Sequence, residues 1–165
     1  MEIRILNSSD AEAYRKIRLH ALQGNPEAFS SSYEEEVEYP LERTASRLDE
    51  GTSFTFGAFI DNTLVGVVSL VLETRHKIKH RATIFAMYVN PDHRKLGVGK
   101  QLMVAAIEEA QKLDEIEQIY LTVNASNEPA KRLYLSLGFK TYGVDKRALK
   151  IEDQYYDEEL MVLVK

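Results

Sequence analysis

The sequence predicts an α/β fold of the α+β kind, with a mixed, mostly antiparallel sheet of about seven strands and about four flanking helices. Short apolar runs between turn residues predict strands, and longer stretches with apolar residues at spacings of three and four predict helices. The order of these segments is β-α-α-β-β-β-α-β-α-β-β. It contains one βαβ crossover, so one strand pair is expected to be parallel and the others antiparallel.

The N-terminal part is expected to form a strand followed by two helices. Met1–Leu6 alternates apolar and polar residues, and Asn7–Asp10 offers capping side chains for a helix that runs to about Leu22. Gly24-Asn25-Pro26 ends that helix. After a serine-rich connection, the acidic segment 34–49 is predicted to be one further helix.

Three strands then follow as a meander. Phe54–Ile60 and Thr63–Leu72 flank the dipeptide Asp61-Asn62, which suits a two-residue hairpin turn. A basic turn over Arg75–Arg81 leads to a third strand at about Thr83–Val89. The RHKIKHR run in this turn is interpreted as a solvated surface, not as a nucleic-acid site.

The second half alternates helices and strands and closes with a hairpin. The apolar stripe over Val98–Leu113 predicts an amphipathic helix, and Ile119–Val123 reads as a buried strand. A second stripe over Ala130–Leu137 is ended by a glycine. Phe139–Leu149 and Tyr155–Val164 are predicted to be the two closing strands.

Length and composition limit the classes of protein. The 165 residues suit one domain, 1–165, and the absence of cysteine excludes disulfides, a cysteine zinc site and an enzyme thiol. We expect a cytoplasmic protein, because no segment has the pattern of a secretory signal or a membrane span. The net charge of −5 argues against a nucleic-acid partner. The four histidines are scattered, so no metal site is expected.

The stretch NPDHRKLGVGKQL, residues 90–102, precedes the first amphipathic helix and has the features of an anion site. Glycines let a backbone approach a ligand closely, and the free amides at a helix start favour negative charge. A nucleotide phosphate loop is excluded, because that pattern requires glycine at Arg94 and Ser or Thr at Gln101. The dinucleotide fingerprint fails too, since its third glycine would fall at Leu102.

Two motifs carry a family resemblance. Arg94–Gly99 reads R-x-x-G-x-G after a strand, and Val123–Asn127 is followed by A-x-x-L-Y-x-x-L-G-F ending at Phe139. Together they resemble the GNAT superfamily of acyl-CoA-dependent N-acetyltransferases, and the match covers essentially the whole chain. The resemblance implies a splayed central strand pair, with a bulge near residue 87, and acetyl-CoA as cosubstrate without a metal.

The resemblance also implies which residues bind the cofactor. Amides at the helix start would hold the pyrophosphate with help from basic side chains, and the end of the third meander strand would bind the pantetheine arm as an added strand. Asn127 is expected to contact the cofactor, to cap a helix, or to do both. The expected cofactor-binding residues are Met87, Tyr88, Val89, Arg94, Lys95, Leu96, Gly97, Val98, Gly99, Lys100 and Asn127.

The resemblance places Tyr134 as the acid that protonates the departing thiolate, with a backbone amide near Tyr88 or Val89 for the oxyanion. From the sequence alone, an aromatic residue on this apolar stripe is usually part of the core, and only the family motif favours the catalytic role. The acceptor amine also needs a base. Glu73 is the first candidate, followed by Glu35, Glu36 and Asp157, and for each the alternative is a solvated surface charge.

We therefore predict transfer of an acetyl group from acetyl-CoA to a primary amine by direct attack in a ternary complex. The alternative is a noncatalytic acyl-CoA-binding regulatory module on the same fold. Phe29, Ser31, Tyr33 and Tyr156, with the neighbouring Tyr155, are candidates for the acceptor pocket or for packing at the sheet edges. We expect the acceptor to be a small-molecule or protein amine. Homodimers are common among the proteins that this chain resembles.

Overall fold

The computed structural model describes residues 1–165 and confirms the predicted class. The elements in chain order are β1 (Glu2–Ile5), α1 (Ala11–Gly24), α2 (Tyr33–Glu36), α3 (Leu41–Leu48), β2 (Ser53–Ile60), β3 (Thr63–Leu72), β4 (Arg81–Val89), α4 (Val98–Lys112), β5 (Gln118–Asn124), α5 (Glu128–Ser136), β6 (Lys140–Ile151) and β7 (Gln154–Val164). Short 3₁₀ turns lie at Ser8–Asp10, Pro26–Ala28 and Pro91–His93. No helix has both the length and the hydropathy to cross a membrane.

The N-terminal helices differ from the prediction in two ways. Helix α1 continues through Gly24 instead of ending at about Leu22. The acidic segment is not one helix but two, α2 and α3, so the fold has five α-helices instead of about four. Pro40 separates them, because its extended backbone, with ψ near 151°, cannot continue the preceding turn, while it suits the position before a new helix.

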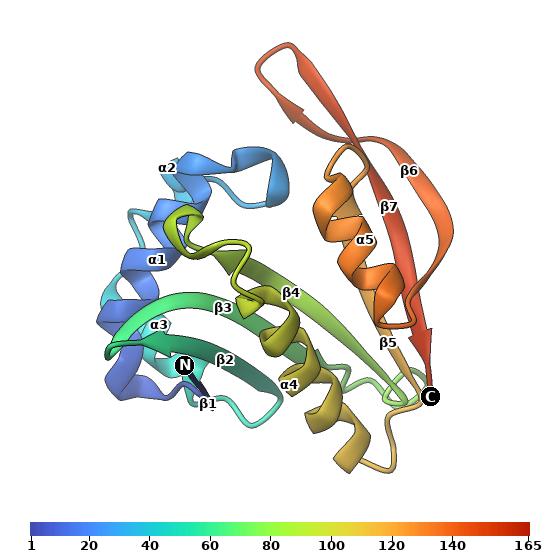
Figure 1. The fold of residues 1–165 in the computed structure, drawn as a ribbon, viewed down its shortest axis with the longest axis horizontal. Coiled ribbons are helices and arrows are strands. Elements are labelled where there is room, and N and C mark those ends of the chain that lie inside the picture. The colour runs from blue at the N-terminus through green and yellow to red at the C-terminus, as the bar shows by residue number, and fades with distance from the viewer.

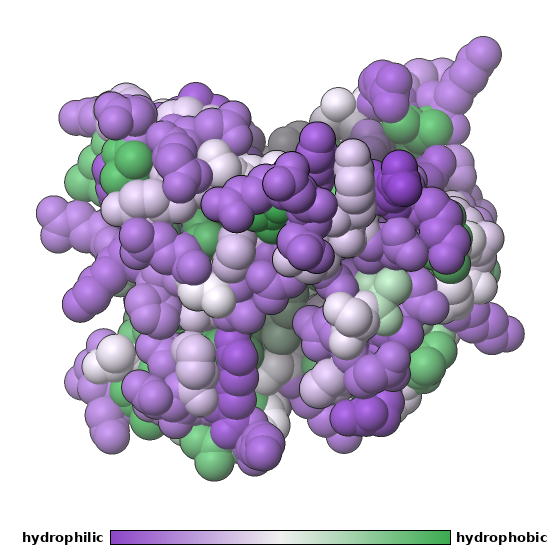
Figure 2. Space-filling view, turned by 90° about the horizontal axis from the view of Figure 1, so that it is seen from above, coloured by the Kyte–Doolittle hydropathy of each residue, from purple (hydrophilic) through white to green (hydrophobic).

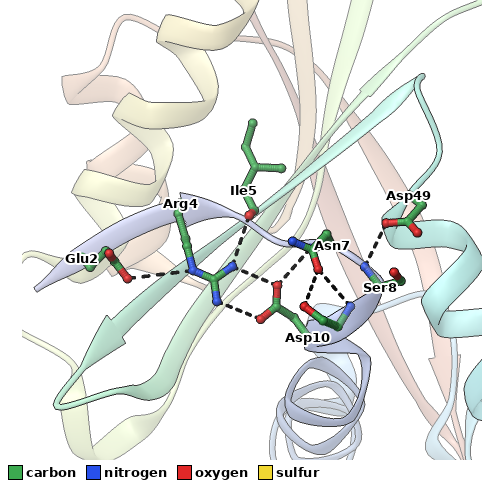
Figure 3. Close-up of polar contacts among 8 residues, drawn as sticks. Glu2, Arg4, Ile5, Asn7, Ser8, Asp10 and Asp49 are labelled. Carbon is green, nitrogen blue, oxygen red and sulfur yellow. Dashed lines mark hydrogen bonds and ion pairs between the residues drawn. The ribbon is translucent and has the colours of Figure 1, made fainter.

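A polar network fixes the entry into α1 (Figure 3). Arg4 on β1 donates two hydrogen bonds to Asp10, at 2.9 and 2.8 Å, and Asn7 and Asp10 form a reciprocal capping box. The hydrogen bonds from Arg4 are the main cause that lowers the pKa of Asp10. A lowered carboxyl pKa means that this network stabilises the fold at neutral pH and loses its contribution as pH falls through the pKa of the folded state.

The seven strands form one sheet in the order β1-β2-β3-β4-β5-β7-β6, in which only β4 and β5 are parallel. The hairpin between β2 and β3 turns at Asp61 and Asn62, whose φ values of 50° and 63° are those of a two-residue turn with left-handed backbone. Helix α4 covers one face of β2–β4, and α1 and α3 cover the other face (Figure 1).

The central strand pair separates as expected. Strands β4 and β5 are hydrogen-bonded only where Arg81–Thr83 faces Gln118–Tyr120, and beyond that point they diverge like the arms of a V (Figure 1). A bulge bends β4 away, because the single residue Val68 on β3 faces two residues, Ala86 and Met87, and Ala86 has a left-handed φ of 56°. The predicted bulge near residue 87 is thus confirmed.

Candidate active site

Unpaired backbone amides gather at the start of α4. Gln101 is the first residue of this helix whose amide finds a backbone acceptor, the Gly97 carbonyl at 3.1 Å. The amides of residues 95–100 donate to no group of the protein. Because the helix dipole adds partial positive charge at the same place, this loop is suited to an anion such as a diphosphate.

The two glycines of the loop have different roles. Gly97 has a left-handed φ of 79°, and a Cβ there would meet no atom within 4 Å, so its contribution is backbone conformation. A Cβ on Gly99 would lie 2.9 Å from Cε of Met87. Gly99 therefore allows α4 to start directly against β4, which brings the free amides close to the diverging strands.

The basic and apolar side chains of the loop are not equivalent. The Nε of Arg94 donates to the Val89 carbonyl at 3.0 Å and its Nη2 donates to Asn25 at 3.2 Å, so this guanidinium holds the loop against β4. Lys95 and Lys100 are exposed and form no ion pair, which leaves their charges available to a phosphate. The flanking Leu96 is 61% exposed, whereas Val98 is buried in the core.

The end of β4 offers a free backbone group to the gap between the strands. The Asn90 amide donates to the Val65 carbonyl on β3 at 2.8 Å. Successive amides of a strand point in opposite directions, so the Val89 amide is directed away from β3, toward β5. Tyr88 lies between Met87 and Val89, but its side chain is buried on the α1 face, where its hydroxyl contacts Nδ1 of His20 at 3.0 Å.

A cavity of about 460 Å³ fills the space between the diverging strands. Its walls come from both faces of the sheet, with α1 and α3 on one side and α5 on the other. Seen from above, the molecule has a notch between two lobes whose rims are largely hydrophilic (Figure 2). The splay therefore creates a passage through the sheet, where a donor and an acceptor can meet from opposite faces.

Tyr134 on α5 lines this cavity. Its ring is buried and packs edge to face against Phe139, with 6.1 Å between ring centroids. Burial raises the pKa of Tyr134 to about 12. The ring belongs to the core, as the apolar stripe suggested, and the hydroxyl makes no hydrogen bond within the protein, which leaves it free beside the cavity.

Two asparagines shape the other wall. Asn127 caps α5, with its side-chain oxygen accepting from the Ala130 amide at 3.3 Å, and it also lines the cavity. Asn124, which the sequence analysis did not single out as a site residue, is buried. It accepts hydrogen bonds from the amide and the hydroxyl of Ser126 and donates to the Glu27 carbonyl at 3.3 Å. The end of β5 is thus tied to the connection that follows α1.

The carboxylates predicted as the base are distributed differently. The Glu73 amide donates to the Arg81 carbonyl, which places Glu73 at the start of β4, at the opposite end from the anion loop and outside the cavity lining. Glu35 caps α2 with Ser32, and Asp157 accepts from the Arg147 amide at 2.8 Å. Of these four predicted carboxylates, only Glu36 lines the cavity, where it forms an ion pair with Arg18 at 2.8 Å.

The chain is similar to known proteins over most of its length. Residues 16–139 match the model of the acetyltransferase (GNAT) family. The chain belongs to the GNAT family. It is an acetyl-CoA-dependent N-acetyltransferase, as the resemblance predicted, and the noncatalytic alternative is not favoured.

Curated and solved relatives agree with this assignment of the acetyltransferase. The L-amino acid N-acetyltransferase AaaT of Escherichia coli is 29% identical over 99% of this chain and 97% of its own length. An N-alpha-acetyltransferase of Sulfurisphaera tokodaii is 28% identical over 62% of this chain and 65% of its own. A GNAT acetyltransferase structure from Streptococcus pneumoniae, 24% identical, covers 99% of both chains with a TM-score of 0.89. A putative acetyltransferase structure from Salmonella typhimurium, 20% identical over 99% of this chain and 93% of that one, contains acetyl-CoA and has a TM-score of 0.81.

A further carboxylate, Glu158 on β7, lines the cavity of the acetyltransferase and could not be identified from the sequence alone. It faces Asn124 on β5, and Asp145 on β6 lies opposite it on the other side. Burial, with the nearby charge of Asp145, raises the pKa of Glu158. Adjacent Asp157 was considered instead, but neighbours on a strand point to opposite faces, and only the register of the sheet shows which one meets the cavity.

The acceptor residues predicted for the acetyltransferase are only partly brought together. Phe29 lines the cavity and packs near Tyr88, with 6.5 Å between ring centroids. Ser31, Tyr33 and Tyr156 do not line it. The side chains that take their place, chiefly arginines and hydroxyls, come from α1, α3 and β2.

Proposed function

We propose that the enzyme acetylates a primary amine by direct attack, with Tyr134 as the acid and Glu158 as the base. The observation that carries this proposal is that Tyr134 and Glu158 line one cavity, which opens between β4 and β5 from both faces of the sheet. The bound acetyl-CoA supplies an acetyl group activated as a thioester.

The free amides of residues 95–100 are proposed to hold the pyrophosphate of the cosubstrate, with Lys95 and Lys100 adding charge. From there the pantetheine arm would run along β4, where the Val89 amide is directed toward the cavity. The same amide is proposed to stabilise negative charge on the acetyl oxygen. Asn127, at the start of α5, is proposed to contact this arm.

In this proposal, each proton that moves during the reaction has a named donor and a named acceptor. Glu158 accepts a proton from the attacking amine while the new C–N bond forms, and Tyr134 donates its proton to the sulfur as the C–S bond breaks. After the products leave, Glu158 loses its proton to water and Tyr134 regains one from water, which restores the starting state. A tyrosine with a pKa of about 12 stays protonated at neutral pH. Desolvation disfavours any anion, so a thiolate beside the buried Tyr134 ring also has a raised pKa and remains a competent proton acceptor.

Thiol release from acetyl-CoA, measured over a panel of amines with mass detection of the product, tests the function. The expected result is amine-dependent release and a product heavier by one acetyl group. Binding of acetyl-CoA without release for any amine would instead identify a regulatory module.

A primary amine as acceptor agrees with the names of two relatives, an L-amino acid N-acetyltransferase and a spermidine N(1)-acetyltransferase. Cytoplasmic location and a homodimer remain predictions.

Replacing Glu158 by glutamine tests the base. Because a general base contributes ~10²-fold or more, kcat should fall by about that factor, while the affinity for acetyl-CoA stays unchanged. The wild type should lose activity as pH falls through the raised pKa of Glu158, since only the carboxylate accepts a proton, and Glu158→Gln should lack this acid limb. Glu108→Gln, an exposed position on α4, is the control. An unchanged pH profile in Glu158→Gln would exclude this residue as the base.

A further inference from the structure

Arginines dominate the half of the cavity that lies on the α1 and α3 side of the sheet. This side is opposite to α5, so it is the acceptor side under the proposed function. The arginines of the lining are Arg15, Arg18, Arg43 and Arg47, and its only carboxylates are Glu36 and Glu158. An excess of positive charge here contrasts with the net charge of −5 for the whole chain.

Two of the arginines are used by the protein itself. Arg18 forms a bidentate pair with Glu36, at 3.0 and 2.8 Å, so these two charges compensate each other. Arg15 donates to the Val37 carbonyl at 2.9 Å and to the Tyr39 carbonyl, which fixes the connection between α2 and α3. The guanidinium groups of Arg15 and Arg18 are therefore already engaged in hydrogen bonds within the protein.

The other two arginines form no ion pair, and the one carboxylate near them, Glu36, which feels the charge of Arg47, is already bound by Arg18. Arg43 and Arg47 lie four residues apart on α3, which places them on one face of this helix, and neither forms an ion pair. Arg43 stacks over the Tyr39 ring at 3.7 Å, which orients its guanidinium without neutralising it. Both side chains are exposed at the mouth of the cavity, so a solvated anion can reach them.

Hydroxyl groups continue this polar wall into the cavity. Thr44 lies between the two arginines on α3, and Thr55 and Ser69 form a buried pair at 2.8 Å on the floor. Planar guanidinium groups bind carboxylates and phosphates by paired hydrogen bonds, and hydroxyls can add further donors. Glu158 lies elsewhere in the lining, toward the splayed strands, so the site has an anion-binding part and a separate amine-accepting part.

We propose that Arg43 and Arg47 bind an anionic group of the acceptor, which is therefore a small amine that also carries a carboxylate or a phosphate. This inference rests on the proposed function and adds the acceptor class to it. A polyamine is disfavoured because its second cation would meet uncompensated arginines.

Matched pairs of acceptors test this proposal. The rate of thiol release is measured for an α-amino acid and its carboxamide, for O-phosphoethanolamine and ethanolamine, for an acidic peptide, and for spermidine. A parallel calorimetric titration follows each compound into enzyme saturated with coenzyme A. We expect kcat/KM for the anionic member of at least one pair to exceed that of its neutral partner ~10-fold or more. The pair that shows the preference distinguishes carboxylate from phosphate.

Variants then assign the preference to the two arginines. In Arg43→Gln/Arg47→Gln, KM for the anionic acceptor should rise ~10-fold or more with kcat nearly unchanged, and the preference over the neutral partner should disappear. KM for acetyl-CoA should not change, and Arg75→Gln, at an exposed position in the turn before β4, should behave like the wild type.

Equal rates for both members of each pair would overturn the proposal, as would spermidine or the peptide as the best substrate, or a preference that survives in the double variant. These outcomes leave the proposed function intact, because amine-dependent thiol release is still seen. If no amine is acetylated and the titrations show no preference for the anionic members, both are overturned.

Discussion

Tyr134→Phe is expected to lower kcat by ~100-fold or more, because it removes the only proton donor that the structure offers to the departing sulfur on the α5 side of the cavity. The ring stays in place against Phe139, so the fold and the affinity for acetyl-CoA should change little. Initial rates of thiol release, together with calorimetric titration of the variant with acetyl-CoA, separate a loss of chemistry from a loss of binding.

Two further observations make this result specific. Tyr142→Phe, at an exposed position on β6, should have wild-type activity. Since burial raises the pKa of Tyr134 to about 12, the wild type should show no alkaline loss of activity due to this hydroxyl up to roughly pH 10. If Tyr134→Phe turned over at the wild-type rate, the residue would have only its role in the core.

Gly99→Val is expected to weaken the binding of coenzyme A by ~100-fold. A Cβ at this position would lie 2.9 Å from Cε of Met87, so the branched side chain must push the start of α4 away from β4. The amides would then no longer meet the diphosphate together with the strand edge, and the loss of one or two charge-assisted hydrogen bonds at ~1.5–3 kcal/mol each gives a factor of this size.

Calorimetric titration with coenzyme A measures the effect, and thermal unfolding shows whether the variant is folded. Gly51→Val is the matched control, because a Cβ there would meet no atom within 4 Å. Unchanged affinity in folded Gly99→Val would mean that the close approach of α4 to β4 is not needed for binding.

The strands and the long helices could be predicted from the sequence because their hydrophobic pattern is local. The hairpin at Asp61-Asn62, for example, needed only two apolar runs and a turn dipeptide. The prediction of one helix over residues 34–49 was wrong. The acidic residues favour helix throughout this segment, but the backbone of the single residue Pro40 interrupts it. The bulge at Ala86 and Met87 was expected only from the family resemblance.

The residues of the site also fall into those that could be predicted from local sequence and those that depend on the packing of distant segments. The loop around Gly97 is contiguous in the sequence, so the free amides that the structure places at the start of α4 could be predicted from the residues themselves. Glu158 and Arg47 could not be found this way, because one depends on the pairing of β7 with β5 and the other on where α3 packs. Glu73 was preferred for its position at a strand end, and the antiparallel direction of β3 places that end far from the loop.

The binding of a diphosphate by the amides of residues 95–100 is the central claim, and one calorimetric comparison tests it. The wild-type protein is titrated with coenzyme A and, separately, with pantetheine, which has the same arm without the phosphates. We predict saturable binding of one coenzyme A per chain, ~100-fold or more tighter than pantetheine. Equal affinity for the two compounds, or no uptake of coenzyme A, would contradict this assignment of the loop.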